Sequence, residues 1–189
     1  MEFMDVMLKR ASVKKFSTKK PAPEMISAGI NAAETAPSAG NTQCLLYIMV
    51  DDPETIEQLA KACRQDFVRK MPWVVVILSN PQQFKKLFDH RAPKFMGHYV
   101  GAAIENFLLK MVDQGLATNW IGSFSDVTIQ NLFGIPDGIG IEALIAVGYE
   151  LKSRPTKQRV RYALDNRLFF GGWGNKFYKP IGKARRADI

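Results

Sequence analysis

The sequence is poor in the residues from which metal and disulfide sites are built. Its 189 residues include two cysteines and two histidines. This scarcity excludes a disulfide-rich secreted scaffold, and His90 and His98, eight residues apart, do not have the spacing of a zinc site. No metal is therefore predicted. Cys44 and Cys63 both lie in apolar patterns, so they are expected to be buried free thiols in a reducing cytoplasm.

Long hydrophobic runs are missing as well. The longest, Cys44–Val50 and Trp73–Leu78, are far shorter than the roughly 20 apolar residues that span a bilayer. The first residues include Glu2 and Asp5 and do not resemble a secretory signal. No internal repeat or low-complexity segment occurs. With 47% hydrophobic residues, the chain is expected to be globular and to have no membrane partner.

Positive charge is concentrated at one end of the chain. Residues 152–189 hold 11 Lys/Arg against 2 Asp/Glu, a net charge of +9, whereas the whole chain has +8. We divide the sequence into a domain over 1–165 and a basic, aromatic-rich C-terminal extension over 166–189, which is expected to pack on the same domain or on a partner subunit. The charge alone fits a solvated tail, a phosphate site or a nucleic-acid contact.

The hydrophobic pattern predicts helices and strands that do not alternate strictly. Helices are expected over 3–10, from Pro21–Pro23 onward, from Asp52 onward, over 81–89, over 95–114, and from Ser125 to near Gly134. Strands are expected at Cys44–Val50, Trp73–Ser79, Ala117–Ile121 and Ile141–Tyr149. The second strand is apolar on both faces and is therefore predicted to be central. This order favours an α+β fold, or three layers with helices on both faces of the sheet.

Two polar segments carry the candidate chemistry. Arg10, Ser12 and Lys14 occupy alternate positions, and alternate side chains of an extended segment point the same way. Two cations and a hydroxyl converging in this manner suit an anionic, oxygen-rich ligand. The second segment, Pro37–Gln43, is a tight polar turn at the end of a predicted helix.

Further segments follow in a characteristic order. Pro37, Ser38, Asn41 and Gln43 fit the pattern P-S-x-x-N-x-Q, and the later matches are Leu116–Phe124, Leu132–Pro136, Ala143–Tyr149 and Lys157-Gln158-Arg159. Taken together with Arg10–Lys14, these motifs span residues 8 to about 160. In this combination the sequence resembles the FMN-dependent nitroreductase family.

The resemblance implies a mostly antiparallel α+β sandwich that forms an intertwined homodimer, with two FMN sites at the subunit interface. Arg10, Ser12 and Lys14 of one subunit would hold the phosphate, the ribityl chain and the pyrimidine side of the ring. Lys157 and Arg159 would also hold the phosphate. From the other subunit would come the turn, with Pro37, Ser38 and Asn41; Ile121 and Gly122 would border flavin N5, with the Gly122 N–H bonding to it.

The implied chemistry needs no catalytic side chain, because the flavin itself carries the hydride. Lys14 beside N1/O2 would stabilise the reduced flavin anion. The expected activity is reduction of nitroaromatics, quinones or related small molecules by NADH or NADPH, in a ping-pong cycle. The alternatives are dehalogenation or flavin breakdown on the same fold, a flavin-binding module without turnover, and a basic nucleic-acid-binding protein. Nucleic acid is not the expected partner, since Lys157 and Arg159 already have a role.

Several positions depart from the family pattern. Cys44–Leu46 stands where many members have an aromatic residue, Lys70–Trp73 where they have x-A-P, and His98-Tyr99 where they have an acid. Because these positions shape the substrate side, they bear on acceptor choice more than on flavin binding. Trp120 is expected in the core rather than stacked on the flavin.

Overall fold

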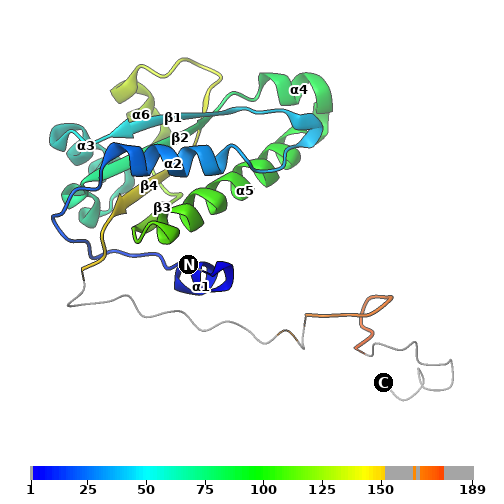
Figure 1. The fold of residues 1–189 in the computed structure, drawn as a ribbon. Helices are drawn as coiled ribbons and strands as arrows, with labels where there is room; N and C mark the ends of the chain where they lie inside the picture. The colour runs from blue at the N-terminus through cyan, green and yellow to red at the C-terminus, as the bar shows by residue number, and fades with distance from the viewer. Residues whose placement is uncertain (1, 152–163, 165–166, 177–189) are drawn as a thin grey trace. The chain divides into compact units, whose positions relative to one another are not determined.

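The computed structural model describes residues 2–151, 164 and 167–176 of the chain. The chain divides into two compact units, Met1–Lys157 and Gln158–Ile189. The helices and strands described below lie in the first unit (Figure 1). In the second unit, the Phe170 amide donates to the Asn175 carbonyl over 2.8 Å, and the Asn175 side-chain amide donates to the Phe170 carbonyl over 2.7 Å. These two bonds close a short turn.

Four strands make one antiparallel sheet. They are β1 (Leu45–Val50), β2 (Trp73–Ser79), β3 (Ala117–Ile121) and β4 (Gly140–Gly148), arranged in the order β1-β2-β4-β3. All residues of β2 are buried, which confirms its predicted central position. The two edges are β1 and β3, and the edge at β3 matters for the site.

Helices cover both faces of this sheet. They are α1 (Phe3–Lys9), α2 (Pro23–Ala33), α3 (Pro53–Cys63), α4 (Gln82–Phe88), α5 (Ala92–Asp113) and α6 (Asp126–Phe133). Side chains alternate along β2: Val75 and Ile77 join the core formed with α2, α4 and α5, whereas Val74 and Val76 join the core formed with α3 and α6. The predicted α+β arrangement with helices on both faces is therefore confirmed (Figure 1).

Local sequence signals explain where several helices begin and end. The Asp52 carboxylate accepts from the Thr55 amide over 2.8 Å at the start of α3. The Ser125 hydroxyl accepts from the Thr128 amide over 3.4 Å at the start of α6, and Gly134 ends that helix with a φ of 61°. Within the described residues, no helix is both long and apolar enough to cross a membrane.

Some boundaries differ from the sequence prediction. The long helix begins at Ala92 instead of residue 95, because Pro93 is tolerated in a first turn. The last strand begins at Gly140 and ends at Gly148, one residue early at each end. A 3₁₀ helix, η2 (Asp66–Lys70), was not predicted at all. Five residues are too short to show a periodic pattern.

Candidate functional site

The N-terminal segment runs along the edge strand β3. Ser12 pairs with Thr118 in a parallel bridge, and the Val13 amide donates to the Thr118 carbonyl over 2.9 Å. The buried Asn119 amide closes the contact by donating to the Val13 carbonyl over 2.9 Å. Val13 is buried while Ser12 and Lys14 are exposed, so the expected alternation is present.

Arg10 is held where α1 ends. Its Nε lies 3.5 Å from Oε1 of Glu105 on α5, and its side chain is 21% exposed. An ion pair that is only partly buried contributes little free energy. The guanidinium has five N–H donors, so most of them remain for an anion.

Lys14 borders a cavity of about 550 Å³. The cavity is lined by Lys14, Lys15, Phe16, Asp66, Phe67, Arg69, Lys70, Met71 and Leu151. The Lys14 ammonium lies 5.6 Å from the centre of the Phe67 ring. Four cations, one acid and several apolar side chains make a lining that suits a ring system with negative charge.

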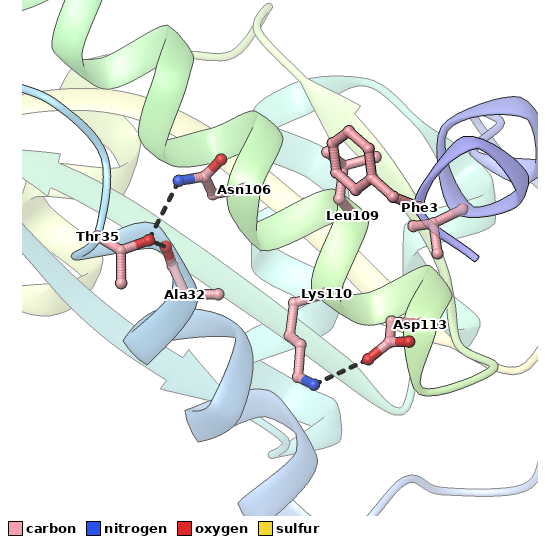
Figure 2. Close-up of a pocket in the computed structure, with 8 residues that line it drawn as sticks. Phe3, Ala32, Thr35, Asn106, Leu109, Lys110 and Asp113 are labelled. Atoms are coloured by element: carbon pink, nitrogen blue, oxygen red, sulfur yellow. Dashed lines mark hydrogen bonds and ion pairs between the residues drawn. The ribbon is translucent and has the colours of Figure 1, made fainter. Parts of the chain in front are cut away.

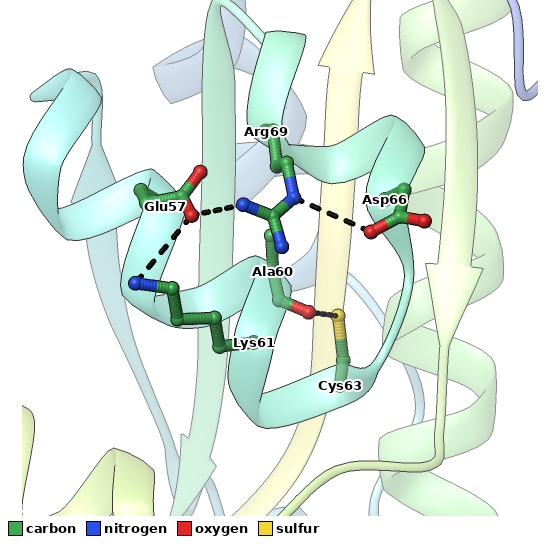
Figure 3. A network of polar contacts seen from close by, with 6 residues as sticks. All are labelled: Glu57, Ala60, Lys61, Cys63, Asp66 and Arg69. Atoms are coloured by element: carbon green, nitrogen blue, oxygen red, sulfur yellow. Dashed lines mark hydrogen bonds and ion pairs between the residues drawn. The ribbon is translucent and has the colours of Figure 1, made fainter.

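Ion pairs fix η2, which contributes to this cavity (Figure 3). The Arg69 guanidinium contacts Glu57 of α3 and, over 3.3 Å, the Asp66 carboxylate. Lys61 adds a pair to Glu57 at 3.5 Å. Because Asp66 is engaged by Arg69, the charge that faces the cavity comes mainly from Lys14, Lys15 and Lys70. The sequence analysis did not predict Phe67, Arg69 or Lys70 as site residues. The only signal in the sequence was the departure from the family pattern at Lys70–Trp73.

Ile121 and Gly122, the residues predicted to border flavin N5, lie at the end of β3. Ile121 is buried, whereas Gly122 is exposed and a Cβ placed on it would meet nothing within 4 Å. The backbone is therefore open to a ligand at the predicted flavin position. Trp120 is 41% exposed, so its predicted place in the core is wrong. It pairs with Ile145, whose side chain packs on the α5 side, but β3 is an edge strand and that face is not fully covered there.

The turn at Pro37–Asn41 follows α2 and packs against α4. Gly40 and Asn41 have φ values of 59° and 54°, the left-handed region that glycine and asparagine tolerate best. The Phe88 Cζ atom lies 3.2 Å from where a Cβ on Gly40 would stand. Ser38 is half-buried, and Pro37 and Asn41 are exposed.

Within one chain the two polar segments contact different elements. Gly40 of the turn packs against Phe88 at the end of α4, whereas Arg10 pairs with Glu105 in the second half of α5. Thr35, two residues before the turn, accepts from the Asn106 amide of α5 over 3.4 Å. The structure therefore brings Ser12 to β3, Lys14 to the cavity and Arg10 to α5, while Gly40 of the turn packs against Phe88. Lys157 and Arg159 lie outside the described residues.

A second polar group lies between α2, β1 and α5. The Tyr47 hydroxyl donates to the Glu34 carboxylate over 2.7 Å. Burial, followed by the negative charges of Glu142 and Glu34, raises the pKa of the Cys44 thiol to about 11. Burial, with smaller effects of Glu34 and Cys44, raises the pKa of Tyr99 to about 12. A thiol with this pKa stays protonated at neutral pH, which makes Cys44 a weak nucleophile.

A smaller cavity of about 330 Å³ lies between α1, α2 and α5 (Figure 2). Its polar groups are paired with one another: Lys110 with Asp113 at 2.9 Å, and the Asn106 amide with the Thr35 hydroxyl at 3.4 Å. The predicted flavin residues do not line it. It is therefore separate from the candidate site.

Comparison with known proteins identifies the family of this chain. The model described as "Nitroreductase family" matches residues 7–67 and 59–149, which include Arg10–Lys14, the turn and β3. The chain belongs to the nitroreductase family.

Relatives of this nitroreductase-family chain cover most of its length. An Archaeoglobus fulgidus protein, provisionally named NADH dehydrogenase/NAD(P)H nitroreductase, is 27% identical over 88% of this chain and 93% of its own. A Thermotoga neapolitana iodotyrosine deiodinase is 22% identical over 84% of this chain and 96% of its own.

Solved structures share the fold. A nitroreductase family protein of Clostridium novyi has a TM-score of 0.73 at 27% identity, covering 94% of this chain and 98% of its own. The NADPH:FMN oxidoreductase of Vibrio harveyi, in complex with NAD⁺, has a TM-score of 0.77 at 19% identity, covering 92% and 78%. The second likeness shows the fold alone.

Proposed function

We propose that this protein is an FMN-dependent NAD(P)H oxidoreductase that reduces nitroaromatic, quinone or related acceptors in a ping-pong cycle. The observation that carries the proposal is the Arg10–Lys14 segment, which runs along β3 toward the open backbone at Gly122 and borders a cation-rich cavity. The names of the Archaeoglobus and Vibrio proteins support the use of a nicotinamide and FMN. The two unpaired cysteines are compatible with work in a reducing cytoplasm.

We assign the site to a homodimer. Within one chain the Arg10–Lys14 segment contacts β3 and α5, whereas Gly40 of the Pro37–Asn41 turn packs against Phe88 at the end of α4. A partner that presents its own turn would complete the site. Exposed apolar side chains on α1, such as Phe3 and Met4, support a covered surface there, since monomers rarely expose such rows.

The residues then take distinct roles. Arg10, Lys157 and Arg159 bind the phosphate through charge-assisted hydrogen bonds, and Ser12 binds the ribityl chain. Lys14 lies at the pyrimidine side, where its ammonium stabilises a negative ring, and the Gly122 N–H orients N5. Pro37, Ser38, Asn41 and Ile121 border the ring. When bound, FMN would supply hydride transfer from NADH or NADPH to the acceptor.

The test begins with the purified protein. We expect flavin absorbance bands, release of FMN instead of FAD on denaturation, and oxidation of NADH or NADPH that depends on a nitroaromatic or a quinone. Double-reciprocal plots at several acceptor concentrations should give parallel lines. A colourless protein that stays apo with excess FMN would overturn the proposal, and intersecting lines would overturn the ping-pong cycle.

Deiodination is the second candidate, because an iodotyrosine deiodinase is among the relatives. The assay is release of iodide from an iodotyrosine by the FMN-loaded, reduced protein. Iodide release faster than any nitroaromatic or quinone reduction would favour this candidate over the first.

A further inference from the structure

The corner between α4 and α5, residues 82–99, packs on the flavin-side turn. Phe88 at the end of α4 reaches Gly40 of the turn, with its Cζ 3.2 Å from the position of a Cβ there. The Phe88 ring also meets the Phe95 ring edge-on, with centroids 5.1 Å apart and an interplanar angle of 87°. Aromatic side chains thus continue from the turn into the first turns of α5.

Arg91 lies on this aromatic wall. Its guanidinium carbon lies 4.9 Å from the centre of the Phe95 ring, a cation–π contact. Arg91 is exposed, so its N–H donors can reach solvent while its guanidinium carbon lies over the ring. This contact positions the guanidinium, and no ion pair of Arg91 with a carboxylate is seen among the described residues.

The corner also differs in charge from the rest of its unit. Residues 82–99 hold four cations, Lys85, Lys86, Arg91 and Lys94, against one acid, Asp89. All four cations are exposed. Both histidines of the chain, His90 and His98, lie here too and are exposed. Asp89 lies 3.6 Å from His90, and the four cations leave the corner with a net charge of +3 when the histidines are neutral.

Resting on the proposed function, we propose that Arg91, in cation–π contact with Phe95, selects flat acceptors that carry a negative charge. A flat ring fits against Phe88 and Phe95, next to the turn that borders the flavin. A carboxylate or sulfonate on that ring pairs with the Arg91 guanidinium. The surrounding lysines raise the encounter rate of anions, because charge of one sign steers the opposite charge.

The experiment compares two acceptors of the same shape. The probes are 4-nitrobenzoate, an anion, and 4-nitrobenzamide, its neutral counterpart, each assayed with the FMN-loaded dimer and saturating NADH or NADPH. We expect a higher kcat/KM for the anion, and this preference should shrink as salt rises. Arg91→Gln should lower kcat/KM for 4-nitrobenzoate about fivefold and leave that for 4-nitrobenzamide unchanged. Arg91→Lys keeps the charge and loses the planar stack, so an intermediate value is expected.

Lys61→Gln is the matched control, because Lys61 is an exposed cation on α3, on the opposite face of the sheet. It should leave both acceptors unaffected. Equal losses for both acceptors in Arg91→Gln, or no preference for the anion in the wild type, would overturn the inference while turnover of 4-nitrobenzamide keeps the proposed function intact. If neither acceptor nor a quinone is reduced, it is the proposed function that fails.

Discussion

At the scale of single residues, the tightest packing among the described glycines is at Gly29. Gly29 lies in α2 where that helix crosses α5, and it is buried. A Cβ at this position would stand 2.4 Å from Met111 Cε and 2.8 Å from Phe107 Cε2. The absent side chain therefore sets the distance between the two helices on one face of the sheet.

Gly29→Ala should accordingly destabilise the fold. The added methyl group displaces the Phe107 ring as well as the flexible end of Met111, and overpacking of a core typically costs about 1–3 kcal/mol. Chemical denaturation followed by circular dichroism measures the change. Gly97→Ala in α5 is the control, because a Cβ there meets nothing within 4 Å. It should stabilise the helix by up to about 1 kcal/mol. Equal effects of the two substitutions would contradict the packing argument.

The Cys44 thiol makes stability depend on alkaline pH. Its pKa rises from 9.0 to about 11 on folding, so the folded chain holds the proton more tightly than the unfolded chain. This contribution is fully present below pH 9 and is lost as the pH rises toward 11. We expect the free energy of unfolding to fall over that window. In Cys44→Ala the fall should be shallower, although the variant is less stable throughout because it leaves a small cavity. An unchanged slope between pH 9 and 11 would show that the thiol does not contribute.

At the scale of elements, η2 shows how a cavity wall is held by contacts distant in sequence. Arg69 joins η2 to α3 through Glu57 and also pairs with Asp66 (Figure 3). The same element presents Phe67 and Lys70 to the cavity that borders Lys14. Its position therefore controls one wall of the proposed flavin site.

Glu57→Gln should weaken FMN binding by up to about fivefold, since an exposed pair is worth at most about 1 kcal/mol. Loss of the pair lets η2 move relative to Lys14, while the helices keep their packing and the melting temperature changes little. Quenching of flavin fluorescence during titration of the apoprotein gives the dissociation constant. Lys61→Gln removes the other partner of Glu57 and should bind FMN normally, because Lys61 does not line the cavity.

The sequence predicted those elements whose limits are marked by local chemistry. Asp52 starts α3 through its capping side chain, and Gly134 ends α6 through its left-handed backbone. Both signals are local, so no tertiary information is needed. The position of β2 in the centre of the sheet was also predictable, because a strand that is apolar on both faces is buried on both. By contrast, η2 depends on Arg69 meeting a carboxylate 12 residues away, which no local pattern records.

The candidate site divides in the same way. Alternation at Ser12 and Lys14 is a local property, and the structure shows it. Lys70 and Phe67 reach the cavity only through the fold of η2, and they were missed. Trp120 was misplaced because an apolar strand residue looks buried in sequence, whereas its exposure depends on how far α5 extends over an edge strand.

At the scale of the whole molecule, the exposed apolar side chains of α1 bear on assembly. Met4 is 61% exposed, and Phe3 beside it borders the cavity between α1, α2 and α5 (Figure 2). If the proposed homodimer covers this helix, a charge placed on it is buried on assembly without a partner. Such a burial costs several kcal/mol unless the charge is paired.

Met4→Glu should therefore weaken the dimer by at least about 30-fold, the effect of losing an interface residue worth about 2 kcal/mol. FMN content should fall in parallel, because each site takes residues from both copies. Light scattering and flavin absorbance on the same fractions measure the two quantities. Val127→Glu on α6 is a matched control, as Val127 is 66% exposed on the other side of the sheet. A dimer that persists with full FMN content in Met4→Glu would place the interface elsewhere.

The proposed sharing of each flavin site between two copies of the chain has a genetic consequence. In a dimer, each active centre would draw Arg10 from one copy and Ser38 and Asn41 from the other. A subunit defective only in Arg10 and a subunit defective only in Asn41 would each be inactive when produced alone. Coexpressed, they would complement: every mixed pair contains one centre with both defects and one with neither. Recovery of NAD(P)H-dependent reduction on mixing two dead alleles is the outcome that a site contained within a single polypeptide would not give.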